Sequence, residues 1–274
     1  MNTILIPVDF SEISRTSVEF ARLLSGKLNL DVTLLHIINA PSVAVHSTMV
    51  IDADVVEKAR EEAENRLKEW CAELTADGVR CSYLLREGFV VDTVVQTEQE
   101  LQPDLLIMGT TGATGWMGNL IGSNSSAVLS RVKRPVLLIP HDTRVKEFRN
   151  ILYATQLEMV EAEVLKKVFH WAHAFNGKVD LIKVNTQYQL DIFSDNFIIE
   201  ELRRLFPQER FAVYTETASN TLKGIDHYLE ANSVDLIVMT TSRQSFIERL
   251  FNGSVTRKMA LHTDIPLLIY HYEE

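Results

Sequence analysis

The chain has 274 residues, of which 46% are apolar and 23% are charged, a composition typical of a globular protein. Its formal net charge is −10, and the acidic excess is spread over both halves. Because nucleic acids and anionic membranes attract cationic surfaces, this balance argues against both as partners. The N-terminus lacks the basic start of a signal peptide, and no apolar stretch has the length of a membrane span. We therefore expect a cytoplasmic protein.

Two cysteines, Cys71 and Cys81, occur in the chain, and their spacing matches neither a redox CxxC pair nor a zinc-binding pattern. The first falls within an expected amphipathic helix and the second within an expected strand. We interpret both as buried, small hydrophobic side chains and assign them no chemistry.

An internal repeat organises the sequence. The segment 32–37 recurs at 179–184, an offset of 147, whereas the later segment 103–108 recurs at 234–239, an offset of 131. The second copy is therefore shorter by 147 − 131 = 16 residues in its middle. Each copy alternates short apolar runs with longer amphipathic ones, which is the pattern of an α/β fold with a parallel sheet. We predict two tandem domains, at residues 1–141 and 148–274.

The first copy shows the expected elements in chain order. A helix begins after Ser11, a favourable N-cap residue, and buries Val18, Phe20, Ala21, Leu24 and Leu28. A second helix over residues 55–75 presents Val56, Ala59, Ala63, Leu67 and Trp70 to the sheet. The connection at residues 38–54 is either a lid over the site or a disordered insert. Strands are expected at 3–8, 32–37, 80–85, 105–109 and 136–140.

A glycine-rich segment, residues 109–123, follows the fourth strand and leads into a helix at 125–132. Glycines allow a close approach to a ligand, and a helix start offers unpaired amides to phosphate. In a sheet of order 3-2-1-4-5, ligands bind between the first and fourth strands, which end near Asp9 and Gly109. The segment matches neither the GxxxxGK[ST] loop nor the dinucleotide fingerprint. A phosphate-binding loop is favoured over a flexible surface loop.

The residues Gly109-x2-Gly112-x9-Gly122-Ser123 fit the G-x2-G-x9-G-[ST] motif of ATP-binding universal stress proteins. The segments 7–11, 34–37 and 134–140 are also similar to that family in order and spacing, so the chain resembles a tandem pair of its domains. This resemblance implies two open, five-stranded parallel sheets of the Rossmann-like HUP type, with strand order 3-2-1-4-5.

By position, the resemblance implies that Asp9 and Ile37 contact adenosine and that Gly109 and Gly112 contact the ribose and phosphates. Gly122, Ser123 and Ser125 would hold the phosphate chain. Asn124 replaces a small apolar residue but keeps its backbone amide. We expect ATP, AMP or ADP as the ligand, with Mg²⁺ accompanying the nucleotide and no catalytic residues. The predicted site comprises Pro7, Val8, Asp9, Ile37, Met108, Gly109, Thr110, Gly112, Gly122, Ser123, Asn124 and Ser125.

Two side chains near this site have structural alternatives. Asp9 could cap the first helix instead of binding a ligand. His36, which lies in an apolar strand, is interpreted as a structural residue with a satisfied hydrogen bond.

The second copy has lost most of the motif, since Gln156, Thr240 and Arg243 replace Asp9, Gly109 and Gly112. We therefore expect one nucleotide per chain. The last strand of each copy is apolar, and the resemblance implies that these strands pair as an intramolecular pseudo-dimer or in a homodimer. The predicted function is that of a stress-response ATP-binding module. A slow ATPase or nucleotide-transfer enzyme that uses Asp9, and a structural protein that binds no nucleotide, are the alternatives.

Overall fold

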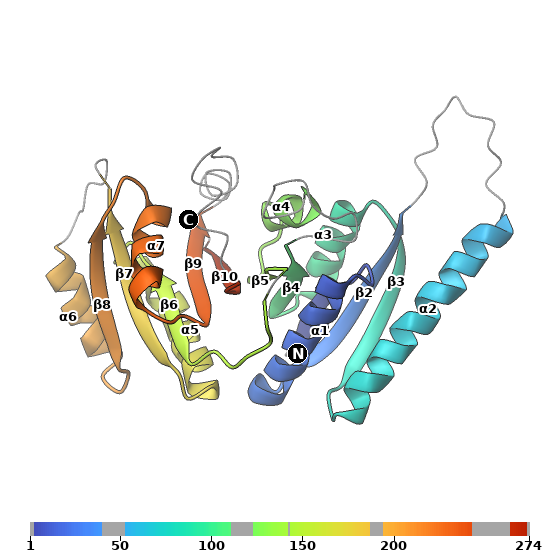
Figure 1. Cartoon of the computed structure of the whole chain (residues 1–274), viewed down its shortest axis with the longest axis horizontal. Helices are drawn as coiled ribbons and strands as arrows, with labels where there is room; N and C mark the ends of the chain where they lie inside the picture. The colour runs from blue at the N-terminus through green and yellow to red at the C-terminus, as the bar shows by residue number, and fades with distance from the viewer. Residues whose placement is uncertain are drawn as a thin grey trace. The chain divides into compact units, whose positions relative to one another are not determined.

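The computed structural model describes residues 3–39, 53–110, 123–141, 143–186, 194–242 and 264–272, and it separates the chain into two compact units that divide after Arg134 (Figure 1). Each unit is an α/β assembly built on a mostly parallel sheet, as the alternating pattern predicts. Within the described ranges, every helix is too short or too polar to cross a membrane. The boundaries at 141 and 148 stay predictions.

The first unit has four parallel strands in the order β3-β2-β1-β4. The middle strand β1 is fully buried at Ile4, Leu5 and Ile6, and long apolar runs of this kind are typical of a sheet covered on both faces. In chain order the elements are β1 (Thr3–Pro7), α1 (Glu12–Leu28), β2 (Asp31–Asn39), α2 (Ala53–Ala76), β3 (Cys81–Gly88), α3 (Val90–Leu101), β4 (Leu105–Gly109) and α4 (Ser123–Leu129).

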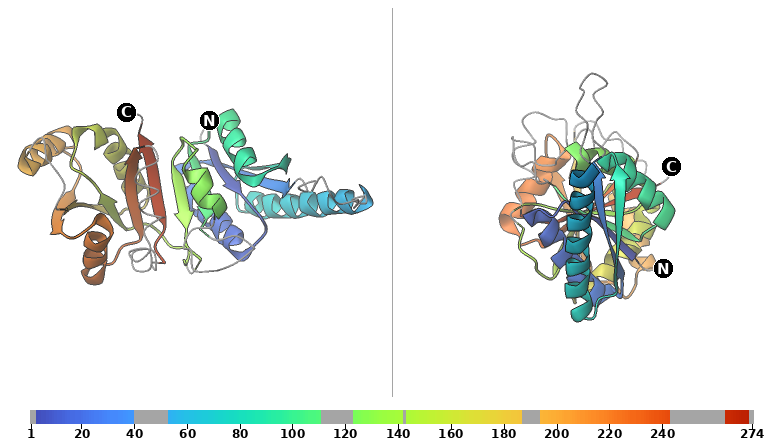
Figure 2. Two further views of the ribbon diagram at one scale, coloured as in Figure 1. Left: turned by 90° about the horizontal axis from the view of Figure 1, so that it is seen from above. Right: turned by 90° about the vertical axis from the view of Figure 1, so that its right-hand side faces the viewer.

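Helices cover both faces of this sheet (Figure 2). Helices α1 and α2 share one face, where Arg15 forms an ion pair with Glu73. Helices α3 and α4 share the other, where Arg131 Nη1 lies 2.7 Å from Asp92 Oδ1. Right-handed crossovers require this arrangement, because the winding direction reverses between β3 and β4.

The two predicted helices agree with α1 and α2 in extent but differ in detail. Ser11 caps α1 by accepting a hydrogen bond from the Ser14 amide. Leu28 is half-buried, and Ala59 is exposed because α2 runs past the edge strand there. The side chain of Val56 and most of the 38–54 connection, a predicted lid or insert, lie outside the described residues.

The second unit repeats the topology, with parallel strands in the order β8-β7-β6-β9-β10. It also contains β5, the last strand of the first copy, which pairs antiparallel with β10 through Val136 and Ile269. The elements are β5 (Val136–Ile139), β6 (Asn150–Ala154), the 3₁₀ turn η1 (Met159–Glu161), α5 (Ala162–Ala174), β7 (Lys178–Asn185), α6 (Asp195–Leu205), β8 (Phe211–Thr217), α7 (Thr221–Ala231), β9 (Leu236–Ser242) and β10 (Leu267–Tyr272).

The cysteines differ from their sequence interpretation, because Cys71 and Cys81 form a disulfide between α2 and the start of β3. The chain reverses through Gly78, which has a φ of 83°, and this turn brings the two Cα atoms to 5.3 Å. That separation lies within the range of disulfides. Sequence spacing alone could not show this reversal, and the assignment of no chemistry to the pair was wrong.

Candidate functional site

The predicted site lies at the carboxyl ends of β1 and β4. These strands are parallel neighbours, with Ile4 beside Leu105 and Leu5 beside Leu106. Their carboxyl ends therefore meet at the same edge of the sheet, which is the point where ligands bind in open α/β folds. Pro7 is half-buried, Val8, Met108 and Thr110 are buried, and Asp9 is exposed.

Asp9 turns back onto the start of α1. Its Oδ1 atom accepts hydrogen bonds from the Ser11 amide at 3.0 Å, the Ser11 hydroxyl at 2.5 Å and the Ser14 hydroxyl at 2.6 Å. Phe10, between Asp9 and the helix, has a φ of 61° in the left-handed region, which makes this sharp turn possible. The structure thus gives Asp9 the helix-capping contacts that the sequence left as an alternative, while its exposed position keeps it at the crevice.

Gly109 connects β4 to both adjoining helices. A Cβ atom at this position would lie 2.5 Å from Cγ1 of Ile13 on α1, so only glycine allows this close packing. On the other side, the Ser125 hydroxyl donates a hydrogen bond of 2.8 Å to the Gly109 carbonyl. Ser125 is buried, whereas Ser123 and Asn124 are exposed at the start of α4. This hydrogen bond fixes the start of α4 against the end of β4.

The neighbouring strand β2 brings Ile37, which is half-buried, to the same edge of the sheet. The preceding residue, His36, donates from Nδ1 to the Val8 carbonyl over 2.8 Å and has the structural place expected from the sequence. Burial lowers the pKa of His36, against the opposing effects of the Val8 hydrogen bond and the Asp9 charge. A neutral imidazole can therefore hold the end of β1 in place.

Helix α2 supplies a cation that the sequence analysis missed. The Arg66 guanidinium lies 4.2 Å from the centre of the Phe10 ring, and Trp70 meets the same ring edge-on at 5.4 Å. Phe10 also contacts the His36 ring at 4.5 Å. The i, i+4 spacing of Arg66 and Trp70 was the available signal, since it places both on one helix face.

The other two glycines of the motif, Gly112 and Gly122, lie outside the described residues. The structure therefore brings together the strand-end and helix-start parts of the predicted site, and the remaining part of the motif stays a sequence prediction.

The equivalent crevice of the second unit is filled by a buried carboxylate. Glu161, at the position of Ser14 in the repeat, is only 5% exposed and lies between the ends of β6 and β9. Thr240, which replaces Gly109, is one of its hydrogen-bond donors. Five groups donate to this carboxylate: the Tyr153 hydroxyl at 2.9 Å, the Thr155 hydroxyl at 2.7 Å, the Gln156 amide at 3.1 Å, the Glu158 amide at 3.2 Å and the Thr240 hydroxyl at 3.1 Å.

A second buried charge replaces His36 in this unit. Lys183 occupies the equivalent position on β7, is 1% exposed, and forms an ion pair with Asp195 in the first turn of α6. Burying a charge is unfavourable unless it is paired, so this lysine and aspartate depend on each other. The strand ends of the second unit therefore contain two buried charged side chains, Glu161 and Lys183.

Comparison with known proteins assigns the family. The model of the universal stress protein family matches residues 1–140 and again residues 147–271. The chain belongs to the universal stress protein family. Since the two matches cover nearly all of the chain, it is a tandem member with two family domains.

Individual relatives agree with this tandem organisation. Universal stress protein G of Escherichia coli is 30% identical over 140 residues, which are 50% of this chain and 97% of the relative. A universal stress protein of Methanocaldococcus jannaschii is 24% identical over 150 residues, 50% of this chain and 93% of its own. A universal stress protein structure from Archaeoglobus fulgidus matches 100% of this chain and 97% of its own, with a TM-score of 0.78 and 22% identity. This last likeness concerns the fold.

Proposed function

We propose that the first repeat of this universal stress protein binds an adenine nucleotide at the carboxyl ends of β1 and β4, with ATP as the main ligand. The adjacency of these two parallel strands carries the proposal, because it joins Asp9 to Gly109, where the glycine motif begins. Asp9 and Ile37 would face the adenosine. The motif from Gly109 to Ser125 would follow the ribose and phosphates, and Mg²⁺ would accompany the phosphates.

One cation lies at the end of the proposed site where the adenosine would bind. Arg66 is a cation held beside Phe10, next to Asp9, and its side chain comes from α2. An anion beside it would be favoured, although the exposure of this arginine limits the effect. No enzymatic step is part of the proposal, and the protein would act as a nucleotide-binding module of the stress response in the cytoplasm.

The second repeat would not bind nucleotide, because Glu161 already occupies the equivalent crevice with a negative charge. Its carboxylate is bonded to groups from β6 and β9, so a ligand would have to break these bonds before it entered. A nucleotide phosphate would also meet a buried carboxylate of like charge. We expect one nucleotide per chain.

The second repeat would instead support the assembly. The antiparallel pairing of β5 with β10, from Leu138 beside Leu267 to Val136 beside Ile269, covers two apolar strands that would otherwise be exposed edges. We propose that this pairing makes the chain an intramolecular pseudo-dimer, and that a homodimer is a further assembly of such chains.

Calorimetric titration of the full chain with ATP and Mg²⁺ tests the site. We expect about one site per chain and a loss of affinity of about a hundredfold or more in Gly112→Arg, since an arginine prevents close approach of the nucleotide to the backbone. Gly26→Arg is the matched control, because a Cβ at Gly26 of α1 meets nothing within 4 Å. Unchanged affinity in a folded Gly112→Arg protein, or two equal sites per chain, would overturn the proposal.

A further inference from the structure

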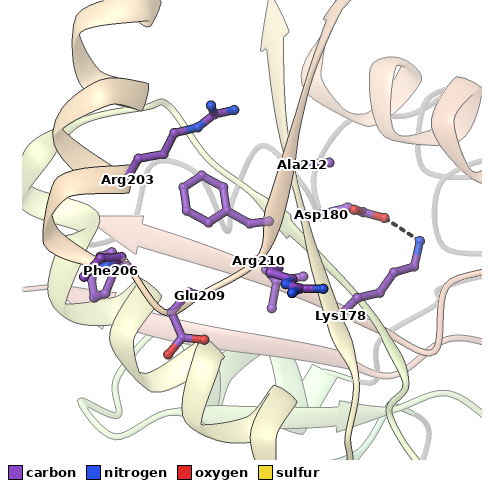
Figure 3. A pocket seen from close by; sticks show the side chains of 10 residues that line it. Lys178, Asp180, Arg203, Phe206, Glu209, Arg210 and Ala212 are labelled. Atoms are coloured by element: carbon purple, nitrogen blue, oxygen red, sulfur yellow. Dashed lines mark hydrogen bonds and ion pairs between the residues drawn. The ribbon is translucent and has the colours of Figure 1, made fainter.

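A pocket of 570 Å³ lies at the amino-terminal ends of β7 and β8, where α6 ends and the chain turns into β8 (Figure 3). Strand β7 contributes Lys178 and Asp180 from one side, and α6 contributes Arg203 from the other. This volume is in the range of small-molecule sites. Because the crevice of an α/β sheet lies at the carboxyl ends of its strands, this pocket is distinct from the crevice that Glu161 fills.

The two acidic side chains of the pocket already have partners. Asp180 Oδ2 accepts hydrogen bonds from Lys178 Nζ at 3.0 Å and from the Tyr228 hydroxyl at 2.8 Å. Burial raises the pKa of Tyr228, with the Asp180 hydrogen bond acting in the same direction, so its hydroxyl stays a donor. The ammonium group of Lys178 thereby compensates the charge of Asp180 within the protein.

The second acid, Glu209, lies 2.8 Å from Nε2 of His173 on α5. Each acid of the pocket therefore has a hydrogen-bond partner of its own within the protein.

Two arginines of the pocket have no such partner. The guanidinium groups of Arg203 and Arg210 form neither a hydrogen bond nor an ion pair with any residue in the described ranges. By contrast, Arg204, beside Arg203 in the last turn of α6, pairs with Glu201 at 2.6 Å. The lining residues carry three positive and two negative charges, a net of +1, in a chain of net charge −10. Both arginines are exposed, and a guanidinium without a partner favours carboxylate, sulfonate or phosphate groups.

Aromatic side chains form the apolar part of the pocket. Phe206 and Phe211 both line it, and both pack on Phe169 of α5, with ring centres at 5.2 Å and 5.8 Å. Phe169 is 3% exposed, so its contacts hold the two lining rings against the core. A fixed aromatic wall beside two unpaired cations suits a ligand with a flat ring and an acidic group.

We propose that this pocket of the second repeat is a binding site for a small organic anion with an aromatic ring. The two arginines line the pocket from different segments and supply the cations for the acidic group, and Phe206 and Phe211 pack against the ring. The site does not depend on the nucleotide site of the first repeat, so the second repeat has a ligand of its own at the other end of its strands.

The probe for this site is 8-anilinonaphthalene-1-sulfonate, titrated into the full chain by fluorescence with and without ATP and Mg²⁺. The test variant carries Arg203→Gln and Arg210→Gln, and the matched control is Arg204→Gln, which removes a paired arginine of the same helix turn. N-phenyl-1-naphthylamine, which has the rings without the sulfonate, measures the contribution of the acidic group. Circular dichroism checks that each variant is folded.

We expect one saturable sulfonate site, unaffected by ATP, whose affinity falls about tenfold or more in the double variant and changes less than about twofold in Arg204→Gln. The neutral analogue should bind equally weakly to the wild type and the double variant. The proposal is overturned by the absence of saturable binding, by an equal loss in Arg204→Gln, or by equal affinity for the neutral analogue. A failure of this kind leaves the nucleotide proposal untouched, because the two titrations use different ligands.

Discussion

The strand ends of the two repeats have the same backbone turn but carry different side chains, an exposed carboxylate in the first repeat and a buried one in the second. Phe10 has a φ of 61° and Leu157, its counterpart 147 residues later, has a φ of 56°. In the first repeat this turn leads from an exposed Asp9 into a helix capped by Ser11. In the second it leads to Glu161, whose buried carboxylate takes five hydrogen bonds.

This difference shows how a duplicated ligand site can become part of the core. The two repeats share the backbone turn and therefore the same space at the ends of their strands. The side chains around that space decide whether it is open to a ligand or filled. Glu161 fills it with a charge, which is stable only because donors from several elements satisfy both oxygens. The second repeat therefore depends on this residue in a way that the first does not.

The largest effect is expected from Glu161→Ala, which leaves buried donors on β6 and β9 without an acceptor. We expect the free energy of unfolding to fall by about 4 kcal/mol. Urea unfolding followed by circular dichroism measures it, with Glu163→Ala, an exposed residue of the next helix turn, as the control that changes less than about 0.5 kcal/mol. The equivalent Ser14→Ala in the first repeat should cost about 1 kcal/mol. Equal costs for the two repeats would contradict the comparison.

A smaller effect is expected from Gly109→Thr, which gives the first repeat the residue found in the second. The new Cβ would lie 2.5 Å from Ile13 Cγ1, so we expect a loss of about 2 kcal/mol of stability from overpacking. A double-mutant cycle with Ile13→Ala checks the cause, because removal of these side-chain atoms should make Gly109→Thr nearly neutral. A cost that is the same in both backgrounds would show that Gly109 is needed for another reason.

The smallest effect is expected on the pH dependence of stability, through a histidine on the last strand, β10. His271 on β10 stands where the first repeat has Pro140, and burial lowers its pKa to about 4. Between pH 6.5 and 4 the unfolded chain binds a proton that the folded chain does not, so stability should fall as the pH falls through this range. His271→Phe should remove this part of the pH dependence, and the exposed His227→Gln should leave it unchanged. Urea midpoints at each pH measure both, and parallel curves for wild type and His271→Phe would rule out the assignment.

The sequence predicted much of the fold because the local patterns agree with the tertiary structure. Apolar runs of strand length became β1 to β5 within three residues at each end, and Ser11 caps α1 as its position indicates. Even some long-range contacts repeat with the sequence: Asp104 accepts from the Thr3 amide, and Asp235 accepts from the Asn150 amide. Identical spacing in two copies made these regularities visible.

The features that were missed join residues far apart in the chain. The bond between Glu161 and Thr240 spans 79 residues, and the alignment of the repeats showed only that Thr240 replaces Gly109. Arg66 belongs to a charged helix, and its i, i+4 spacing from Trp70 places it on the same helix face but does not show that Phe10, 56 residues earlier, will lie beneath it. The cysteine pair was missed although its two residues are separated by only 10 positions, because the distance between them depends on the turn at Gly78, which belongs to no motif.

By itself, the sequence determined the family and the duplication, since periodicity and glycine spacing are local properties of the chain, and the order of the strands followed from the resemblance to that family. Tertiary structure alone decided which side chains meet: a carboxylate in the second crevice, and two arginines without a partner among the described residues, beside fixed phenylalanine rings. Such contacts depend on the packing of whole elements, and the free energy of a charged group depends on neighbours that the chain brings from a distance.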